Sequence, residues 1–216
     1  MNETLKAARL DFSLVRPYMK NILFTMAFPV VFAVINRSLL NGVSFAMSFI
    51  SMTSGYTFSI SEKNGMERLY GILPVSGRHM VIGRYLYTCT MGLLTLMISL
   101  IVQPIILYAL GEAVSFVDIF AATITGIILF SVFTVFLLPG YYKYGAIKGR
   151  LFMFVPAAGY LAVLMFVSTF GFTGNRVLAA IISSPHIFVI VVLLICIMAF
   201  LLSIIVSIRI LQDKEA

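Results

Sequence analysis

The sequence predicts an all-α, polytopic membrane protein with six transmembrane helices and both termini in the cytoplasm. Of its 216 residues, 61% are hydrophobic and 11% are charged. The mean hydropathy is +1.07, whereas soluble domains are about half apolar. Four apolar runs are as long as the roughly 20 residues that a helix needs to cross a bilayer. They cover residues 85–110, 117–138, 151–170 and 187–208, and two weaker runs precede them at 21–35 and 43–60.

Basic residues orient these spans. With six spans, 13 of the 15 Lys and Arg residues fall on one side, and the side rich in Lys and Arg is the cytoplasmic one. We therefore expect a multi-pass protein of the plasma membrane, of bacterial origin. Because the basic residues are spread over several loops and termini, the net charge of +7 is a topology signal and does not indicate nucleic-acid binding. The two basic residues on the outer side are Arg37 and Arg176.

The first element expected is an amphipathic elbow helix over residues 3–20. Its apolar residues recur at helical spacing, at Leu5, Ala8, Phe12, Val15 and Met19, as in helices that lie in the membrane interface. Pro17 is expected to bend or end it. Two alternatives remain open: the helix is a plain membrane anchor, or it also braces the bundle.

The six expected spans belong to a single transmembrane domain that covers residues 1–216. They are 21–36, 42–61, 84–111, 116–138, 151–171 and 186–209, and a short helix is expected on the outer side at 171–185. The second span carries a stripe of small residues, namely Ser44, Ser48, Ser51, Gly55 and Ser59. Such a stripe permits close helix packing, which is the favoured interpretation, or it lines a passage.

A proline in the third span gives the other candidate for a passage. Pro104 frees a backbone carbonyl and kinks the helix, and the preceding Gln103 either pairs with a neighbour or faces a cavity. We name Ser48, Ser51 and Gln103 as candidates for the translocation path. Cys89 and Cys196 fall inside spans and are interpreted as small core residues.

Catalytic chemistry is not expected from this chain. The four strong spans contain no Asp, Glu, Lys, Arg or His in their interiors, although ion-coupled transporters use such groups there. His79 and His186 fall on opposite faces and share no metal, so no metal site is predicted. No nucleophile and base can meet, and GAIKGR at 145–150 lacks P-loop spacing. Any work against a gradient must therefore be powered by a partner.

The loop at 62–79 predicts how that partner binds. Met66, Leu69, Tyr70 and Leu73 recur at helical spacing, with charges beside them and Pro74 after them. Pro74 ends this helix, and Ser76 is a good N-cap for the next one. One interpretation is a helix that faces lipid. The favoured one is a docking helix for a cytosolic motor, in which an apolar side enters a groove of the partner.

Two motifs resemble a known family. EKNGMERLYGILPVSGRHMVIGRYL, which begins at Glu62, is similar to the cytoplasmic loop of ABC-2 type transporter permeases, in the small six-helix branch with separate ATPase subunits. LPGYYKYGAIKGRLF at 138–152 is similar to the segment before the fifth span in that branch. Gly77 departs from the family pattern, in which a bulkier or basic residue follows Pro-Val-Ser.

The resemblance implies the permease subunit of an ATP-binding cassette exporter. Two permease chains, identical or related, would pair above two cytosolic ATPase subunits that bind ATP and Mg; this chain would bind no cofactor. The cargo implied is an amphipathic peptide or lipophilic compound. The ATPase contacts expected are Glu62, Met66, Glu67, Leu69 and Tyr70, with Lys143 and Lys148 as a second contact. The alternative function is a membrane scaffold or immunity protein that sequesters a peptide without transport.

Overall fold

The computed structural model describes residues 3–65, 76–159, 162, 165 and 185–215, and its elements are all helices in these ranges. The chain begins with α1 (Glu3–Val15), the 3₁₀ turn η1 (Arg16–Tyr18), α2 (Met19–Thr25) and α3 (Ala27–Asn36). Pro17 lies in η1, where its fixed φ and missing N–H interrupt the helix. The bend expected at Pro17 is therefore present, and the elbow helix ends at Val15.

The next two helices replace one expected span. Residues 42–61 fall in α4 (Leu39–Thr53) and α5 (Gly55–Lys63). Ser38 caps α4 by accepting a hydrogen bond from the Asn41 N–H at 3.4 Å, as N-cap residues do. Hydroxyl groups bond to backbone carbonyls around the break, from Thr53 to Ile50, from Ser54 to Ser51 and from Thr57 to Ser54. Such bonds compete with the helical ladder and bend helices.

Two long helices follow, α7 (Gly77–Ala109) and α8 (Phe116–Gly149). The 33 residues of α7 extend about 50 Å at 1.5 Å per residue, beyond the ~30 Å hydrocarbon layer. Ser76 precedes α7, and its hydroxyl lies 2.7 Å from Nδ1 of His79. α8 starts with a capping box in which Ser115 and Asp118 exchange hydrogen bonds.

The C-terminal part of α8 contains a backbone break. Gly145 has φ 78° and ψ −177°, a region essentially restricted to glycine. After the break the chain turns back on α8, and an added Cβ at Gly140 would contact the ring of Phe152, which lies in η2 (Arg150–Met153). The segment expected as a loop at 140–150 is thus helical with a sharp turn. The last helix is α11 (Pro185–Glu215).

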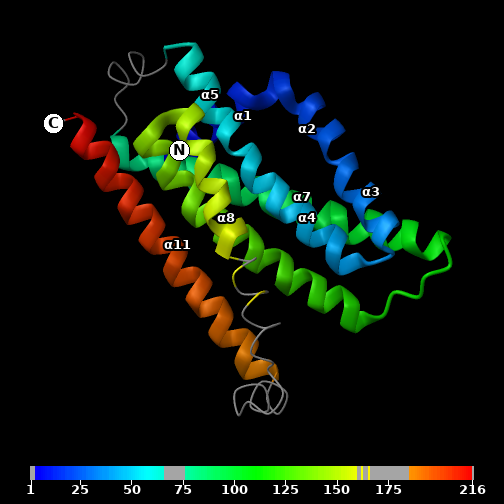
Figure 1. Cartoon of the computed structure of the whole chain (residues 1–216). Coiled ribbons are helices and arrows are strands. Elements are labelled where there is room, and N and C mark those ends of the chain that lie inside the picture. Colours follow the sequence, from blue (N-terminus) through cyan, green and yellow to red (C-terminus); the bar gives the residue numbers. More distant parts are fainter. Residues whose placement is uncertain (1–2, 66–75, 160–161, 163–164, 166–184, 216) are drawn as a thin grey trace.

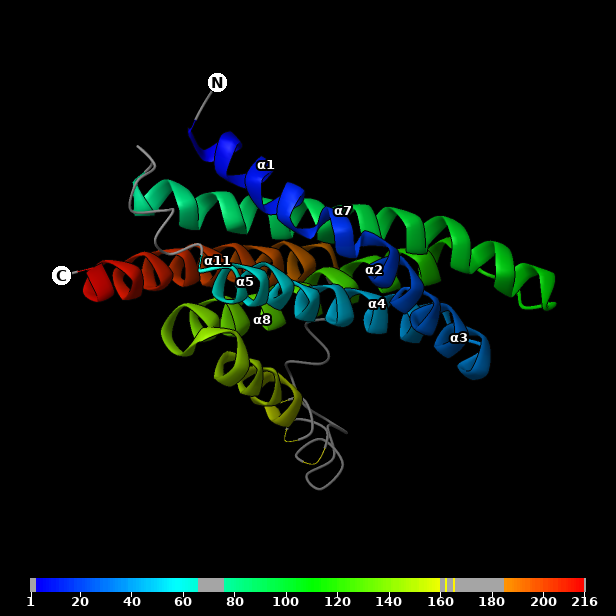
Figure 2. The same cartoon turned by 90° about the horizontal axis from the view of Figure 1, so that it is seen from above.

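The helices form a bundle in which α8 lies between α4 and α11 (Figures 1 and 2). α7 packs against α4, and α1 lies along α7 (Figure 2). The buried hydroxyl of Tyr85 joins α7 to α11 through Ser203 and Ser207, at 2.6 and 3.0 Å. Ser203 in turn donates to the carbonyl of Val135 on α8 at 3.0 Å. These polar contacts fix α11 against its neighbours inside an apolar environment, where a partnerless hydroxyl would be costly.

Three described helices are long and apolar enough to cross a membrane, and a bent pair gives up to four. The long helices contain the expected spans 116–138 and 186–209 and all but the last two residues of 84–111, while 21–36 falls in the bent α2–α3 region. Most of the expected span 151–171 and the outer helix at 171–185 lie outside the described residues. The six-span count and the orientation therefore remain predictions. Arg37, which is expected on the outer side, forms an ion pair of 3.1 Å with Glu112.

Candidate functional site

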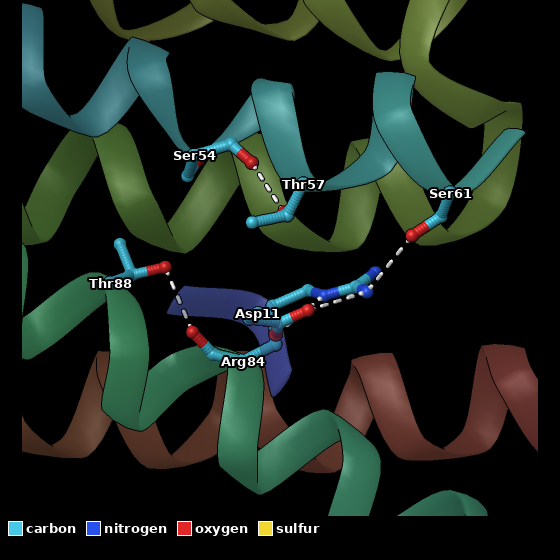
Figure 3. Close-up of polar contacts among 6 residues, drawn as sticks. All are labelled: Asp11, Ser54, Thr57, Ser61, Arg84 and Thr88. Atoms are coloured by element: carbon cyan, nitrogen blue, oxygen red, sulfur yellow. Dashed lines mark hydrogen bonds and ion pairs between the residues drawn. The ribbon is translucent and has the colours of Figure 1, made fainter. Parts of the chain in front are cut away.

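Two charged side chains from distant parts of the chain meet where α5 ends and α7 begins. Arg84 donates to Asp11 twice, from Nε to Oδ2 at 3.2 Å and from Nη2 to Oδ1 at 3.1 Å. Arg84 Nη2 also donates to Ser61 Oγ at 3.5 Å. Figure 3 shows the guanidinium between these two partners, so that α1, α5 and α7 meet at one side chain. A two-point Arg–carboxylate pair fixes geometry as well as adding energy.

This ion pair is buried beside an aromatic wall. Asp11 is 3% and Arg84 7% exposed, and the guanidinium carbon lies 4.3 Å from the ring centroid of Phe58. The Phe58 ring contacts Tyr141 and Tyr142 of α8, at centroid distances of 5.1 and 4.9 Å. A buried charge is tolerated when it is paired and hydrogen-bonded, and the ring face adds a favourable cation–π contact.

A second bond links the same end of α5 to α8. Glu62 Oε1 accepts the backbone N–H of Ala146 at 2.6 Å, directly after the break at Gly145. A break leaves the first N–H groups of the following turn without their usual acceptors, and a carboxylate is well suited to them. We refer to Asp11, Ser61, Glu62, Arg84 and Ala146 as the junction. The junction joins both ends of the 62–79 segment to α1 and α8.

The junction includes two charged residues that the sequence does not identify as functional. In the sequence Arg84 is one of the basic residues that orient the spans, and Asp11 carries no predicted role. A usable signal existed, because Asp11 lies three residues after Ala8 and four before Val15, on the flank of the apolar stripe. In the structure Asp11 and Val15 are buried, whereas Leu5 and Phe12 of the stripe are exposed. The face that α1 packs on α7 is therefore rotated from the stripe, and this packing is what the bracing alternative requires.

The residues predicted to contact an ATPase are only partly described. Met66, Glu67, Leu69 and Tyr70 lie outside the described residues. Lys143 and Lys148 are exposed, and Lys143 Nζ lies 5.4 Å from the ring centroid of Tyr144. Glu62 is bonded to Ala146 within the chain. The ATPase contacts thus remain predictions, and Glu62 has an internal role in addition.

The structure places the three path candidates at different positions. Ser51 is buried between α4 and α8, where it donates to the Phe130 carbonyl at 3.4 Å and accepts from Thr134. Ser48 is half-buried and bonds to Ser44 of its own helix. Gln103 is 1% exposed, and its amide has no hydrogen-bond partner among the described residues. The path role of these residues remains a prediction, and for Ser51 the observed contact is helix packing.

An apolar cavity lies elsewhere in the bundle. Its volume is about 340 Å³, and residues of α4, α7, α8 and α11 line it, among them Met47, Cys89, Leu96, Phe130, Leu193 and Cys196. Neither Ser48, Ser51 nor Gln103 belongs to this lining. Both cysteines are free thiols at its wall. Cavities of this size lined by apolar side chains are typical of sites for small apolar ligands.

The junction is a connection between helices. The junction unites four helices by charge-assisted and hydroxyl hydrogen bonds, and it lies at the base of the 62–79 segment. Among the described residues, His, Cys, Asp and Glu side chains do not gather in groups that could hold a metal ion. This geometry joins α1, α5, α7 and α8 next to the 62–79 segment.

The chain was compared with family models, curated proteins and solved structures. Residues 9–212 match the family model described as ABC-2 family transporter protein. Neither a curated protein nor a solved structure matched the chain.

Proposed function

The chain belongs to the ABC-2 family of transporter proteins, and on this basis we propose that it is the permease subunit of an ATP-driven exporter whose ATPase is a separate cytosolic protein. Membership makes it a multi-pass membrane component of a transporter. The match over residues 9–212 is the observation that carries the proposal, because it extends from within α1 to within α11 and covers the helices between them. Beyond family membership, we propose that ATP hydrolysis by the partner powers transport, that transport is outward, and that the cargo is an amphipathic peptide or lipophilic compound.

The junction supports the separate ATPase. Its bonds attach the beginning of the 62–79 segment to α8 through Glu62, and they attach α7, which continues from the end of that segment, to α1 through Arg84. A partner that pushes on a helix within the segment would then move several helices together. A segment that only rests on lipid would not need such firm attachment at both of its ends.

The apolar cavity supports an apolar or amphipathic cargo. Charged cargo would need paired charges in the wall, because an unpaired buried charge is strongly disfavoured. The lining contains no ionisable residue except two thiols. The proposed assembly has two permease chains, identical or related, with two ATPase subunits that bring ATP and Mg, in the plasma membrane of a bacterium.

Co-purification with an ATPase tests the proposal. The chain is expressed with the nucleotide-binding cassette protein encoded beside it, and the complex is purified in detergent. We expect Leu69→Asp and Glu67→Lys to reduce both co-purification and stimulated ATP hydrolysis, since they reverse the apolar and acidic character of the docking helix.

The matched control is Glu112→Lys, the same charge reversal at the outer rim. Glu112 pairs with the exposed Arg37, and an exposed pair contributes at most about 1 kcal/mol, so this variant should co-purify normally. Unchanged co-purification and hydrolysis in both loop variants would remove the docking role. If no ATPase binds the unaltered chain, the scaffold or immunity alternative is favoured.

A further inference from the structure

Glu62, which the sequence predicts as an ATPase contact, also makes a hydrogen bond within the chain. Its side chain is exposed, and its carboxylate accepts the Ala146 N–H at 2.6 Å. This is a short, charge-assisted bond to the first turn of a helix, the strong type for a carboxylate. It joins residues 84 positions apart in the sequence.

The local backbone explains why this bond is needed. Gly145 has a positive φ of 78°, so α8 is interrupted, and a new helical segment begins with Ala146. An added Cβ at Gly145 would lie 2.5 Å from Glu62 Oε1. The absence of a side chain at Gly145 therefore lets the carboxylate approach the Ala146 N–H.

A second contact holds the same two segments together. Arg150 Nη2 donates to Ser59 Oγ at 3.2 Å, so α5 contacts the segment after the break through two of its residues. Ser61, the residue directly before Glu62 in α5, accepts a hydrogen bond from Arg84. Two consecutive residues thus connect α5 to different helices, Ser61 to α7 and Glu62 to the segment after the break in α8.

We propose that Glu62 is a positioning residue, which transmits a displacement of the 62–79 segment to the break in α8 at Gly145, and that it is not part of the surface that binds the ATPase. The inference rests on the proposed function. When the ATPase moves the segment, α5 moves with it, and the bonds from Glu62 and Ser59 carry the segment after Gly145 along. The glycine supplies the rotation that this movement requires, because it lacks the steric limits of other residues.

Three variants separate positioning from surface contact. Glu62→Ala removes the acceptor. Glu62→Gln keeps an oxygen acceptor of the same length without the charge. Lys63→Ala is the control, since Lys63 is exposed on the next position of the same helix. Each variant is purified with the ATPase, and co-purification, the kcat and apparent KM of stimulated hydrolysis, and amide hydrogen exchange of peptides containing Ala146 are measured.

For Glu62→Ala we expect normal co-purification and an unchanged apparent KM for ATP. We expect exchange at Ala146 to become about tenfold faster, as the loss of a charge-assisted bond implies. The permease-stimulated kcat should fall about fivefold or more, a typical size for coupling between sites. Glu62→Gln should restore most of both quantities, and Lys63→Ala should resemble the unaltered chain.

Three results would overturn the proposal. Loss of co-purification in both Glu62 variants would place Glu62 in the docking surface. Unchanged exchange and unchanged kcat in Glu62→Ala would show that the bond transmits nothing. Failure of the unaltered chain to bind any ATPase would overturn the proposed function and the transmission role with it. In that case the exchange measurement on the isolated chain still decides whether Glu62 holds the Ala146 amide.

Discussion

Asp11 and Arg84 form a buried two-point ion pair, with N–O distances of 3.1 and 3.2 Å, although they are 73 positions apart in the sequence. The pair fixes the N-terminal helix α1 to the start of α7. Gly83 beside Arg84 permits this approach, because an added Cβ there would lie 2.6 Å from the Cβ of Ala7. The ion pair and the small-residue contact together make α1 part of the bundle.

Removal of one partner of this pair should destabilise the protein. Arg84→Ala leaves Asp11 buried without its partner, and removal of one member of a buried pair costs about 3–5 kcal/mol. Arg84→Lys should restore little, since an ammonium cannot reproduce the two-point geometry. The effect is measured as the Tm of thermal unfolding in detergent, on samples that elute as a single monodisperse peak in size exclusion. Arg78→Ala, an exposed residue of the first turns of α7, is the control, and an equal Tm for the Arg84 and Arg78 variants would contradict this prediction.

Gly145→Ala should destabilise the turn after α8. A residue with a Cβ is strained at φ 78° and ψ −177°, by about 1–3 kcal/mol, and the added methyl group would displace the Glu62 carboxylate. The control is Gly159→Ala, because Gly159 is helical and an added Cβ meets nothing within 4 Å. That variant should be neutral or slightly stabilising, as alanine is favoured over glycine in helices. A Tm for Gly145→Ala at or above that of the unaltered chain would exclude strain at the break.

Much of the helical content followed from hydropathy, whereas the junction did not. Long apolar runs predicted α7, α8 and α11 because hydropathy depends on neighbouring residues in the chain. The Asp11–Arg84 and Glu62–Ala146 contacts depend on tertiary packing between distant segments, which no local pattern encodes. Pro17 predicted the end of α1 correctly, since proline acts on its own backbone. Pro139 lies inside α8, and the break comes at Gly145, which has the unusual φ and lies against Glu62.

Side-chain roles were predictable only where they depend on local backbone. Ser115 and Asp118 form a capping box that sequence spacing can identify. Ser51 lies on a stripe of small residues that is compatible with both a passage and a packing contact. Which of the two applies depends on whether another helix covers Ser51, and the sequence does not show that α8 covers it.

The orientation of the bundle is testable by thiol accessibility. In a variant with Cys89 and Cys196 replaced by serine, we expect Ala113→Cys to react with a membrane-impermeant maleimide in intact cells. Asp213→Cys should react only after permeabilisation. Both positions are exposed, and the prediction follows from the excess of Lys and Arg on the side of the termini. If Asp213→Cys reacted in intact cells and Ala113→Cys only after permeabilisation, the topology would be the inverse of the predicted one, and the junction would not lie on the cytoplasmic side.

Ser51→Trp and Ser51→Ala should separate packing from a path role. The hydroxyl is buried between α4 and α8 and bonds to carbonyls of both helices. Trp there should overpack the contact and destabilise it by 1–3 kcal/mol or more, while Ala should lose about 1 kcal/mol. Tm and efflux are measured together. A Trp variant with normal Tm but blocked efflux would return Ser51 to the translocation path.

Filling the apolar cavity should reduce transport of an apolar cargo. Leu193 is half-buried on α11 and lines the cavity, so Leu193→Trp places a larger ring into about 340 Å³ of space. We expect lower efflux of an amphipathic fluorescent dye from vesicles that contain the complex, with normal ATPase co-purification. Ile190→Trp is the control, because Ile190 is 57% exposed on the same helix and does not line the cavity. Since both variants add the same ring to α11, equal dye efflux in the two would show that cargo does not pass through this cavity, whereas a loss confined to Leu193→Trp would place the cargo there.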